Sequence, residues 1–218
     1  MTKASRATTW AIVPVKPFSE AKSRLRPVLT GPARSMLAAR LLTRTLGIVS
    51  QSTQVERLLV TSRDQQALAL ATDTGALALP ERGDQGLNAA VTQAAALAAQ
   101  EGIDRILVVA SDLPLLTLED LQLLFEAAEE SSVVLAPDRH SSGTNALYMT
   151  PPGLIQPAFG PDSYARHVLR AREAHIEPLI IKTNGLGFDL DVPSDYEDLI
   201  RMAPEEWGHQ GFLAGLSA

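Results

Sequence analysis

The segment 187–192, with the sequence GFDLDV, carries two carboxylates two residues apart inside an otherwise apolar run. Side chains alternate between the two faces of a strand, so Asp189 and Asp191 are predicted to project to one side while Phe188 and Leu190 face the core. Two like charges this close raise each other's pKa unless a cation or hydrogen-bond donors compensate them. A divalent metal ion is a suitable partner, because such ions prefer oxygen ligands.

A third carboxylate, Asp112, follows the apolar run ILVVAS and precedes Pro114. Ligands of open α/β sheets bind at the carboxyl ends of the strands, so Asp112 is expected at a site with Asp189 and Asp191. Three carboxylates at strand ends suit one or two Mg²⁺ ions that hold a phosphorylated ligand. The alternatives are that Asp112 forms an ordinary turn, that the acidic pair marks an exposed strand end, or that Asp191 caps the segment PSDYEDLI.

Basic residues gather in the segment PVKPFSEAKSRLRPVL, directly after the first predicted strand, WAIVPV. No glycine-rich pattern follows this strand, so the segment is neither a P-loop nor a dinucleotide-binding fingerprint. Lys16, Lys22, Arg24 and Arg26 could hold a triphosphate here, and a solvated basic turn is the alternative. A basic loop and an acidic cluster at one sheet edge together favour metal and phosphate chemistry.

Two further segments are rich in groups that bind anions. PDRHSSGTNALYM places hydroxyls and a glycine at 141–145 ahead of a predicted strand, and FGPDSYARH places Gly160 and Ser163 at a predicted helix start. Exposed backbone N–H groups at a helix N-terminus bind anions readily, although Ser and Gly also fill ordinary loops. His167 and His175 are expected to be surface residues of the following helix.

Short β-rich runs alternate with longer helical runs, which predicts an α/β fold with a mainly parallel, mixed sheet flanked by helices. Thr117 followed by Asp120 predicts a capping box. We expect a single domain over 1–218 with a core at about 10–202, and residues 203–218 show no clear period. Strands are predicted at 10–15, 57–62, 76–80, 104–111, 132–138, 145–150, 177–183 and 189–192, and helices at 33–49, 64–74, 86–102, 117–130, 162–174 and 194–202.

The overall composition narrows the range of functions. A net charge of −6 over 218 residues argues against nucleic acid as the main partner, because backbone binding needs a basic face. The chain contains no cysteine, so metal ligands must be oxygen or nitrogen atoms. We expect a cytoplasmic protein without membrane contact, since the N-terminus lacks a signal-peptide pattern and no run approaches the roughly 20 apolar residues of a membrane span. Two-fold association is common, which leaves a homodimer open.

Several segments, taken in order, resemble the family of 2-phospho-L-lactate and phosphoenolpyruvate guanylyltransferases, which serve the biosynthesis of coenzyme F-420. They are IVPVKPFSEAKSRL, GDQGLNAAV, SDLPLL, PDRHSSGTNAL, FGPDSYARH and DLDVPSDYEDL, and they span roughly residues 10 to 200. The resemblance implies a nucleotidyltransferase fold of the nucleotide-diphospho-sugar transferase type. It also implies transfer of a guanylyl group from GTP to a phosphorylated three-carbon acid with release of diphosphate.

The resemblance also implies roles for individual residues. Asp112, Asp189 and Asp191 match positions that hold Mg²⁺ and, together with Lys16, form the catalytic set. Contacts to the phosphorylated acid are implied for Lys16, Thr144, Gly160 and Ser163. The GTP side is implied for the loop from Lys16 to Arg24, including Lys22, and for the segment around Asn88.

Two alternatives to this function stay open at the level of the sequence. The first is another nucleotidyltransferase, such as a molybdenum-cofactor guanylyltransferase or a sugar-phosphate nucleotidylyltransferase, which usually carries a glycine-rich loop after the first strand. The second is a non-catalytic phosphate-sensing module of the receiver type, which places its acidic pair after the first strand, where this chain has Lys16. The acceptor acid is equally open among phospholactate, phosphoenolpyruvate and 3-phosphoglycerate.

Overall fold

The computed structural model describes residues 8–81, 86–128 and 132–207. A seven-stranded sheet runs through the centre of the molecule in the order β3-β2-β1-β4-β6-β5-β7. All neighbouring pairs are parallel except those of β6, which lies antiparallel to both β4 and β5. The strands are β1 (Thr9–Pro14), β2 (Val55–Ser62), β3 (Leu77–Pro80), β4 (Arg105–Val109), β5 (Ser132–Pro137), β6 (Thr144–Thr150) and β7 (Leu179–Ile180).

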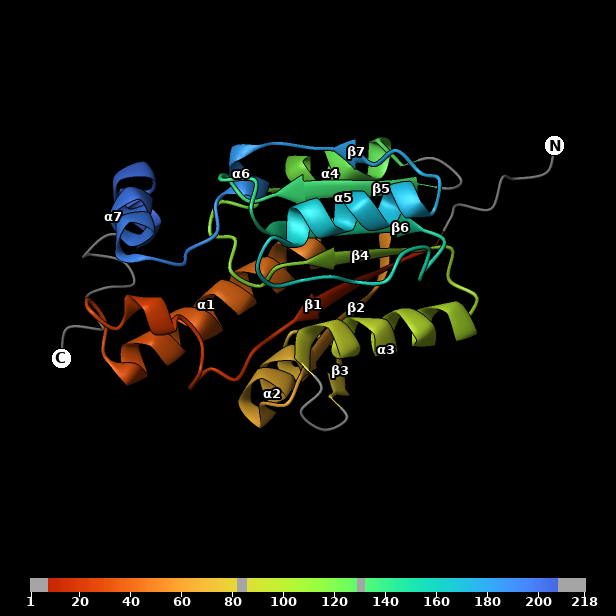
Figure 1. Ribbon diagram of the computed structural model, residues 1–218. Helices are drawn as coiled ribbons and strands as arrows, with labels where there is room; N and C mark the ends of the chain where they lie inside the picture. The colour runs from red at the N-terminus through yellow and green to blue at the C-terminus, as the bar shows by residue number, and fades with distance from the viewer. Residues whose placement is uncertain (1–7, 82–85, 129–131, 208–218) are drawn as a thin grey trace.

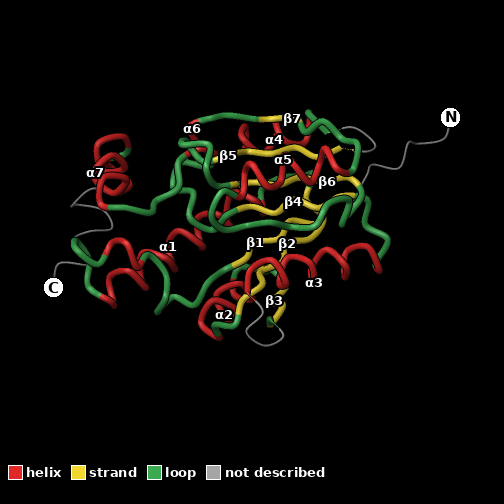
Figure 2. The backbone as a smooth tube through the Cα atoms, viewed as in Figure 1, coloured by secondary structure: helices red, strands yellow, loops and turns green. Residues whose placement is uncertain are grey.

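Helices cover both faces of this sheet, as Figures 1 and 2 show. One face is covered by α1 (Gly31–Ser50), α2 (Gln65–Asp73) and α4 (Leu118–Glu126), and the other by α3 (Gly86–Gln100) and α5 (Ser163–Glu173). The remaining helical elements are the short 3₁₀ turn η1 (Ser23–Leu25), α6 (Asn184–Gly187), α7 (Pro193–Met202) and α8 (Pro204–Trp207). The prediction of an α/β fold with a mainly parallel, mixed sheet is therefore confirmed.

Strand β1 shows why the sheet can be covered on both sides. Every residue of β1 is buried, and its side chains alternate between the two helical layers. Ala11 and Val13 pack with α1, α2 and α4, whereas Trp10 and Ile12 pack with α3 and α5. The central strand is thus fixed from both faces, and its carboxyl end delivers the following loop to a defined place.

A third apolar cluster lies away from the sheet and joins the C-terminal elements to the basic loop. Phe188 and Leu190 pack there with Leu25 of η1, Leu41 of α1 and Trp207 of α8. Figure 1 places α7 at this end of the molecule, beside the start of α1. The cluster anchors the segment that carries Asp189 and Asp191.

The prediction of a strand at 189–192 was wrong, because this segment has no ladder partner. It is extended, with Phe188 and Leu190 buried and Asp189 and Asp191 partly exposed, so the predicted alternation of faces is present without a strand. The segment lies beyond the end of β4, where the backbone bond from Leu190 N to Asp112 O (3.3 Å) joins it to the chain that follows β4.

Other element bounds also differ from the prediction. β7 covers two residues instead of 177–183, because Thr183 caps α6 and turns the chain away from the sheet. Helix α4 ends at Glu126, and its capping box is present, with Thr117 and Asp120 bonded to each other's backbone. α8 begins just after the end of α7 at Met202, where no period was visible. Predictions that fall on 1–7, 82–85, 129–131 and 208–218 lie outside the described residues.

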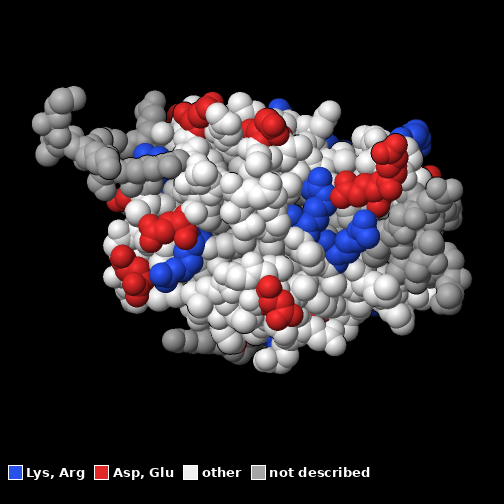
Figure 3. Space-filling model, turned by 180° about the vertical axis from the view of Figure 1, so that it is seen from behind, with Lys and Arg blue, Asp and Glu red and all other residues white. Residues whose placement is uncertain are grey.

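Charged side chains are mixed on the face that Figure 3 shows, where basic and acidic groups lie next to one another in small sets. Within the described ranges, no helix is long and apolar enough to cross a membrane.

Candidate active site

The predicted site residues converge on one cavity of about 500 Å³ at the carboxyl ends of β1 and β4. The loop after β1 contributes the basic residues, and the chain after β4 contributes Asp112. In Figure 1 the arrowheads of β4 and β5 point toward this end of the sheet. The predicted residues that line the cavity are Lys16, Lys22, Arg24, Asp112, Thr144, Gly160, Ser163, Asp189 and Asp191.

The antiparallel strand β6 explains how Thr144 reaches this edge. Val109 of β4 pairs with Ala146, and Ala110 N donates to Asn145 O at 2.8 Å. The beginning of β6 therefore lies beside the end of β4, so Thr144 and Asn145 stand next to the segment that leads to Asp112. A parallel strand would have placed these two residues at the opposite edge.

Lys22 lies between two of the carboxylates. Its Nζ is 2.5 Å from Asp112 Oδ2 and 3.2 Å from Asp191 Oδ1, and its side chain is only 6 % exposed. The backbone of Lys22 is left-handed, with φ 53°, just before η1. Burial disfavours the charged ammonium, but the attraction of Asp112 and Asp191 outweighs it, and the pKa of Lys22 is raised. Arg24 is more loosely placed, 3.8 Å from Asp191 and largely exposed.

Among the described residues, no cation compensates the Asp189 carboxylate in this way. Its Oδ1 is 3.5 Å from the side-chain amide of Asn145, at the limit of a hydrogen bond. Burial raises the pKa of Asp189 to about 6, and the neighbouring charges of Asp112 and Asp191 add to this shift. The third carboxylate therefore sits in an environment that a bound cation would relieve.

The side chains at the site have ligand atoms suited to a hard divalent cation. Among the described residues, no group of three or more acidic or histidine side chains has the spacing that would hold a metal ion. Asp112 and Asp191 nevertheless converge on one ammonium group, so the pair can hold a positive charge between them. All three carboxylates supply the oxygen ligands that Mg²⁺ prefers.

A further part of the cavity lining comes from α5 and the loop before β6. Gly160, with φ 113°, and Asp162, with φ 54°, turn the chain sharply into α5, and Ser163 N donates to Gly160 O. Tyr164 N donates to Ser142 O at 3.2 Å, which joins the helix start to the loop at 138–143. Ser163 is buried, and with Thr144 it contributes hydroxyl groups to the cavity lining; these two residues are called the hydroxyl wall below.

The prediction of a surface position for His167 was wrong. This side chain is fully buried between Thr144 Oγ1, 2.9 Å from Nδ1, and Ala158 N, 2.8 Å from Nε2. The other predicted surface histidine, His175, is exposed and follows the end of α5. A lone histidine on an amphipathic helix carries no sequence signal that distinguishes these two positions.

Asn88, predicted on the nucleotide side, lies in the first turn of α3 and is not among the residues that line the cavity. Its side chain bonds twice to the main chain of Phe159: Nδ2 donates to Phe159 O at 3.0 Å, and Phe159 N donates to Oδ1 at 2.7 Å. The amide therefore holds the start of α3 against the chain that leads to Gly160. Direct contact with nucleotide stays a prediction for Asn88. Arg26 is exposed and lies outside the cavity lining.

Asn145 and Asp138 were not among the predicted site residues. Asn145 is buried and donates to Leu186 O at 2.8 Å, which ties β6 to α6 just before Asp189. The Asp138 carboxylate accepts from the backbone of His140, Ser142 and Gly143 and shapes the loop that enters the cavity. The sequence signals available for them were an asparagine at the start of a predicted strand and an aspartate shortly before Ser141, Ser142 and Gly143.

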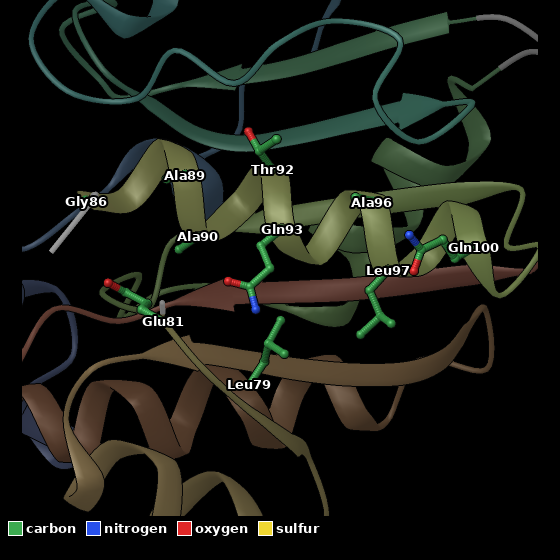
Figure 4. A pocket seen from close by; sticks show the side chains of 10 residues that line it. All are labelled: Leu79, Glu81, Gly86, Ala89, Ala90, Thr92, Gln93, Ala96, Leu97 and Gln100. Carbon is green, nitrogen blue, oxygen red and sulfur yellow. The ribbon is translucent and has the colours of Figure 1, made fainter. Parts of the chain in front are cut away.

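A second cavity, of about 620 Å³, lies between β3 and α3. Figure 4 shows Gln93 and Leu97 pointing from α3 toward Leu79 of β3. Glu81 is the charged residue of its described lining, so the cavity carries no cluster of groups for phosphate or metal chemistry. The chemistry-bearing residues gather in the first cavity instead.

The mixed α/β sheet is shared with solved structures that are named as nucleotidyl or nucleotide-sugar transferases. The fold is similar to that of a protein from Desulfovibrio desulfuricans provisionally named a nucleotide-diphospho-sugar transferase, with a TM-score of 0.74, 17 % identity and coverage of 95 % of this chain and 94 % of the other. A nucleotidyl transferase from a Methanothermobacter species gives a TM-score of 0.62 at 14 % identity, with coverage of 96 % and 99 %.

The family follows from the sequence comparisons. Residues 9–216 match the family described as guanylyl transferase CofC like, and the chain belongs to this family. It is 40 % identical to a phosphoenolpyruvate guanylyltransferase of Sphaerobacter thermophilus, over 90 % of this chain and 95 % of the relative. It is 33 % identical to a 2-phospho-L-lactate guanylyltransferase of Methanothermobacter thermautotrophicus, over 88 % and 84 %. The protein is therefore an enzyme of the nucleotidyltransferase type.

Proposed function

We propose that this protein transfers a guanylyl group from GTP to a phosphorylated three-carbon acid, phosphoenolpyruvate or 2-phospho-L-lactate, with release of diphosphate. Within coenzyme F-420 biosynthesis, this reaction would activate the acid. The observation that carries the proposal is one cavity lined by two chemically different sets of side chains. Lys22 and three carboxylates form one set, and the hydroxyl wall of Thr144 and Ser163 forms the other.

The proposed reaction needs positioning more than acid–base chemistry. A phosphate oxygen of the acid attacks the α-phosphorus of GTP, and the bond from this phosphorus to the oxygen that bridges to the β-phosphate breaks. Diphosphate leaves with the electron pair of that bond. Because a phosphate is already an adequate nucleophile, the step depends on alignment and on stabilising the charge that develops on the phosphates.

The basic residues of the loop after β1 have the charge to stabilise this step. Lys16 and Arg24 are exposed at the cavity, so they can contact the triphosphate without losing an existing buried partner. We assign Lys22 to the phosphates as well, since a polyphosphate offers its ammonium more negative charge than the two carboxylates it contacts now. Asp112, Asp189 and Asp191 would hold Mg²⁺, which would neutralise charge on the nucleotide phosphates.

The hydroxyl wall is assigned to the acid. Thr144 and Ser163 offer hydroxyl groups, and Lys16 offers a cation. A phosphate and a carboxylate on one small molecule require several such donors at short distance. This wall does not distinguish phosphoenolpyruvate from 2-phospho-L-lactate by charge, because the two acids carry the same anionic groups.

The test is an assay with purified protein, GTP, Mg²⁺ and one of phosphoenolpyruvate, 2-phospho-L-lactate or 3-phosphoglycerate. Diphosphate release is followed continuously, and the guanylylated acid is identified by mass spectrometry. CTP and ATP replace GTP in parallel reactions, and Asp112→Asn serves as the inactive control. Diphosphate release with GTP and one acid is expected. Activity only with CTP or ATP, or no release with any acid while an authentic guanylyltransferase works in the same buffer, would disprove the proposal.

A further inference from the structure

His167 is a buried titratable side chain, 0 % exposed, that the proposed chemistry does not use. It lies on α5, and its ring packs edge-on against Phe159, with ring centroids 4.9 Å apart. Both ring nitrogens have partners, Thr144 Oγ1 for Nδ1 and Ala158 N for Nε2. A histidine bonded at both nitrogens has a fixed ring orientation.

The backbone partner determines which nitrogen carries the proton. Ala158 N can only donate, so Nε2 of His167 must be the acceptor. In a neutral imidazole the other nitrogen then carries the hydrogen, so Nδ1–H donates to Thr144 Oγ1. The neutral form is consistent with the surroundings, because burial, with Arg170 and Arg166 nearby, lowers the pKa of His167 to about 4.

This arrangement determines the role of the Thr144 hydroxyl. Oγ1 accepts from His167, so its own hydrogen must point to another acceptor. In the part of the chain that the structure describes, Thr144 Oγ1 has no second hydrogen-bond partner, and Thr144 lines the cavity. The hydroxyl is therefore available as a donor toward the space assigned to the acid.

We propose that His167 is a positioning residue that holds the Thr144 hydroxyl as a hydrogen-bond donor toward an anionic oxygen of the acid substrate. This inference rests on the proposed function for the identity of the acid. It adds a residue that touches no substrate, and it explains why a neutral histidine is buried behind this wall. The same ring holds Ala158, so the hydroxyl and the chain leading to Gly160 are set by one side chain.

Two substitutions separate these two contacts. In His167→Asn, an amide N–H can take the place of Nδ1–H and still donate to Thr144. In His167→Gln, an amide oxygen can take the place of Nε2 and still accept from Ala158. If His167 acts through Thr144, the Thr144 hydroxyl is no longer held toward the anionic oxygen of the acid in His167→Gln. The KM for the acid should then rise about tenfold or more, the usual effect of losing a hydrogen bond to a charged group. His167→Asn should stay within about threefold of the wild type, and the KM for GTP should change little in both.

The opposite order, with His167→Asn weaker than His167→Gln, would show that His167 acts only by holding Ala158 and would overturn the proposal. An equal increase in the KM of both substrates would overturn it as well. Thr144→Val should reproduce the effect of His167→Gln and should add little to it in the double variant. Melting curves of all variants identify any that fail to fold.

A measurement without substrate keeps this inference separate from the proposed function. Two-bond ¹⁵N–¹H correlation spectra of the full-length wild type report the tautomer of each histidine, and the His167→Gln spectrum assigns the signal. Protonation at Nδ1 is expected. Protonation at Nε2, or on both nitrogens at neutral pH, would overturn the hydrogen-bond assignment even in an active enzyme. If no acid is a substrate, the proposed function fails and the acid-binding role of Thr144 fails with it, whatever the tautomer.

Discussion

The ammonium group of Lys22 lies between the carboxylates of Asp112 and Asp191, 2.5 Å from the first and 3.2 Å from the second. In the chain, Asp112 is 90 positions and Asp191 is 169 positions from Lys22. Both carboxylates therefore converge on one positive charge. In the protein without substrates, an internal cation thus balances part of the acidic cluster.

Lys22 should therefore compete with divalent metal for the acidic cluster. We expect Lys22→Gln to bind Mn²⁺ about tenfold or more tightly in the absence of GTP, because removing a cation within 4 Å leaves the carboxylates without their compensating charge. Guanylyl transfer by the same variant should fall. Mn²⁺ binding can be measured by electron paramagnetic resonance of the free ion. Arg24→Gln is the matched control, since Arg24 is exposed and 3.8 Å from Asp191, and it should change Mn²⁺ affinity much less. Equal Mn²⁺ affinity in the wild type and Lys22→Gln would contradict this competition.

Removing the acidic cluster one residue at a time should abolish turnover without unfolding the protein. Asp112→Asn, Asp189→Asn and Asp191→Asn are each expected to lower kcat by about 100-fold or more, the range seen when one group that stabilises transition-state charge is lost. Glu177→Gln is the control, because Glu177 pairs with Arg172 on the exposed surface, where an ion pair contributes little. Full activity of either Asp189→Asn or Asp191→Asn would rule out a metal-binding role for that residue.

The partly buried Asp189 and the fully buried His167 should impose opposite pH dependences on stability. The pKa of Asp189 is raised from 3.8 to about 6, so the folded protein binds this proton more tightly than the unfolded chain. Its contribution is fully present below about pH 4 and is lost as the pH rises through about 6. His167 acts in the reverse direction: its pKa falls from 6.5 to about 4, so its contribution is present above about pH 6.5 and is lost as the pH falls toward 4.

Single variants, measured in metal-free buffer, separate the contributions of Asp189 and His167 to the pH dependence of stability. Asp189→Asn should remove the loss of stability between pH 4 and 6 and raise the melting temperature at pH 7.5. His167→Gln should remove the loss on acidification, which corresponds to at most about 3 kcal/mol for a shift of this size. Urea unfolding at half-unit pH steps measures both effects. Parallel curves for the wild type and His167→Gln from pH 4 to 6.5 would show that His167 is not held neutral.

Gly185 of α6 should tolerate no side chain. A Cβ at this position would lie 1.9 Å from Asp120 Oδ2 and 2.8 Å from Leu115 O, and Asp120 is itself held by the α4 capping box. Gly185→Ala should therefore destabilise the protein by about 1–3 kcal/mol, the usual cost of overpacking, and should lower activity by displacing the nearby Asp189. Gly47→Ala in the middle of α1 meets nothing within 4 Å and should stabilise by about 0.5–1 kcal/mol. Urea unfolding of both variants checks this contrast.

The sequence was sufficient for the alternation of strands and helices and for the collection of acidic, basic and hydroxyl residues at one sheet edge. The prediction that Asp189 and Asp191 project to the same side was correct although the expected strand is absent. Side chains alternate with period two in any extended segment, whether or not the segment pairs with a strand. A strand also needs a neighbouring strand to pair with. The segment 189–192 has none because β4 ends before it reaches this segment.

The contacts that no local pattern encodes could not be predicted. Lys22 reaches Asp112 and Asp191 because a left-handed backbone aims it into the cavity, and nothing in SEAKSRL specifies that conformation. His167 is buried because Thr144 and Ala158 meet behind α5, a packing relation between three separate segments. Asn88 looked like a ligand contact by its place in the motif, and its actual bonds to Phe159 depend on how α3 meets that loop.

Because β6 runs in the reverse direction, it reaches the site with its first residues, and the loop before it also lies at the site. Within the described strands, β6 is the one whose first residues, rather than its last, lie at the working edge, and they are joined there to α6 through Asn145. The loop at 138–143 that leads into β6 is tied to two neighbouring parts of the site, because Arg139 N donates to Gly187 O at 2.8 Å and Tyr164 N donates to Ser142 O at 3.2 Å. An engineered change of acceptor through this loop must therefore keep its length and these two bonds, so that the segment of Asp189 and the start of α5 stay in place.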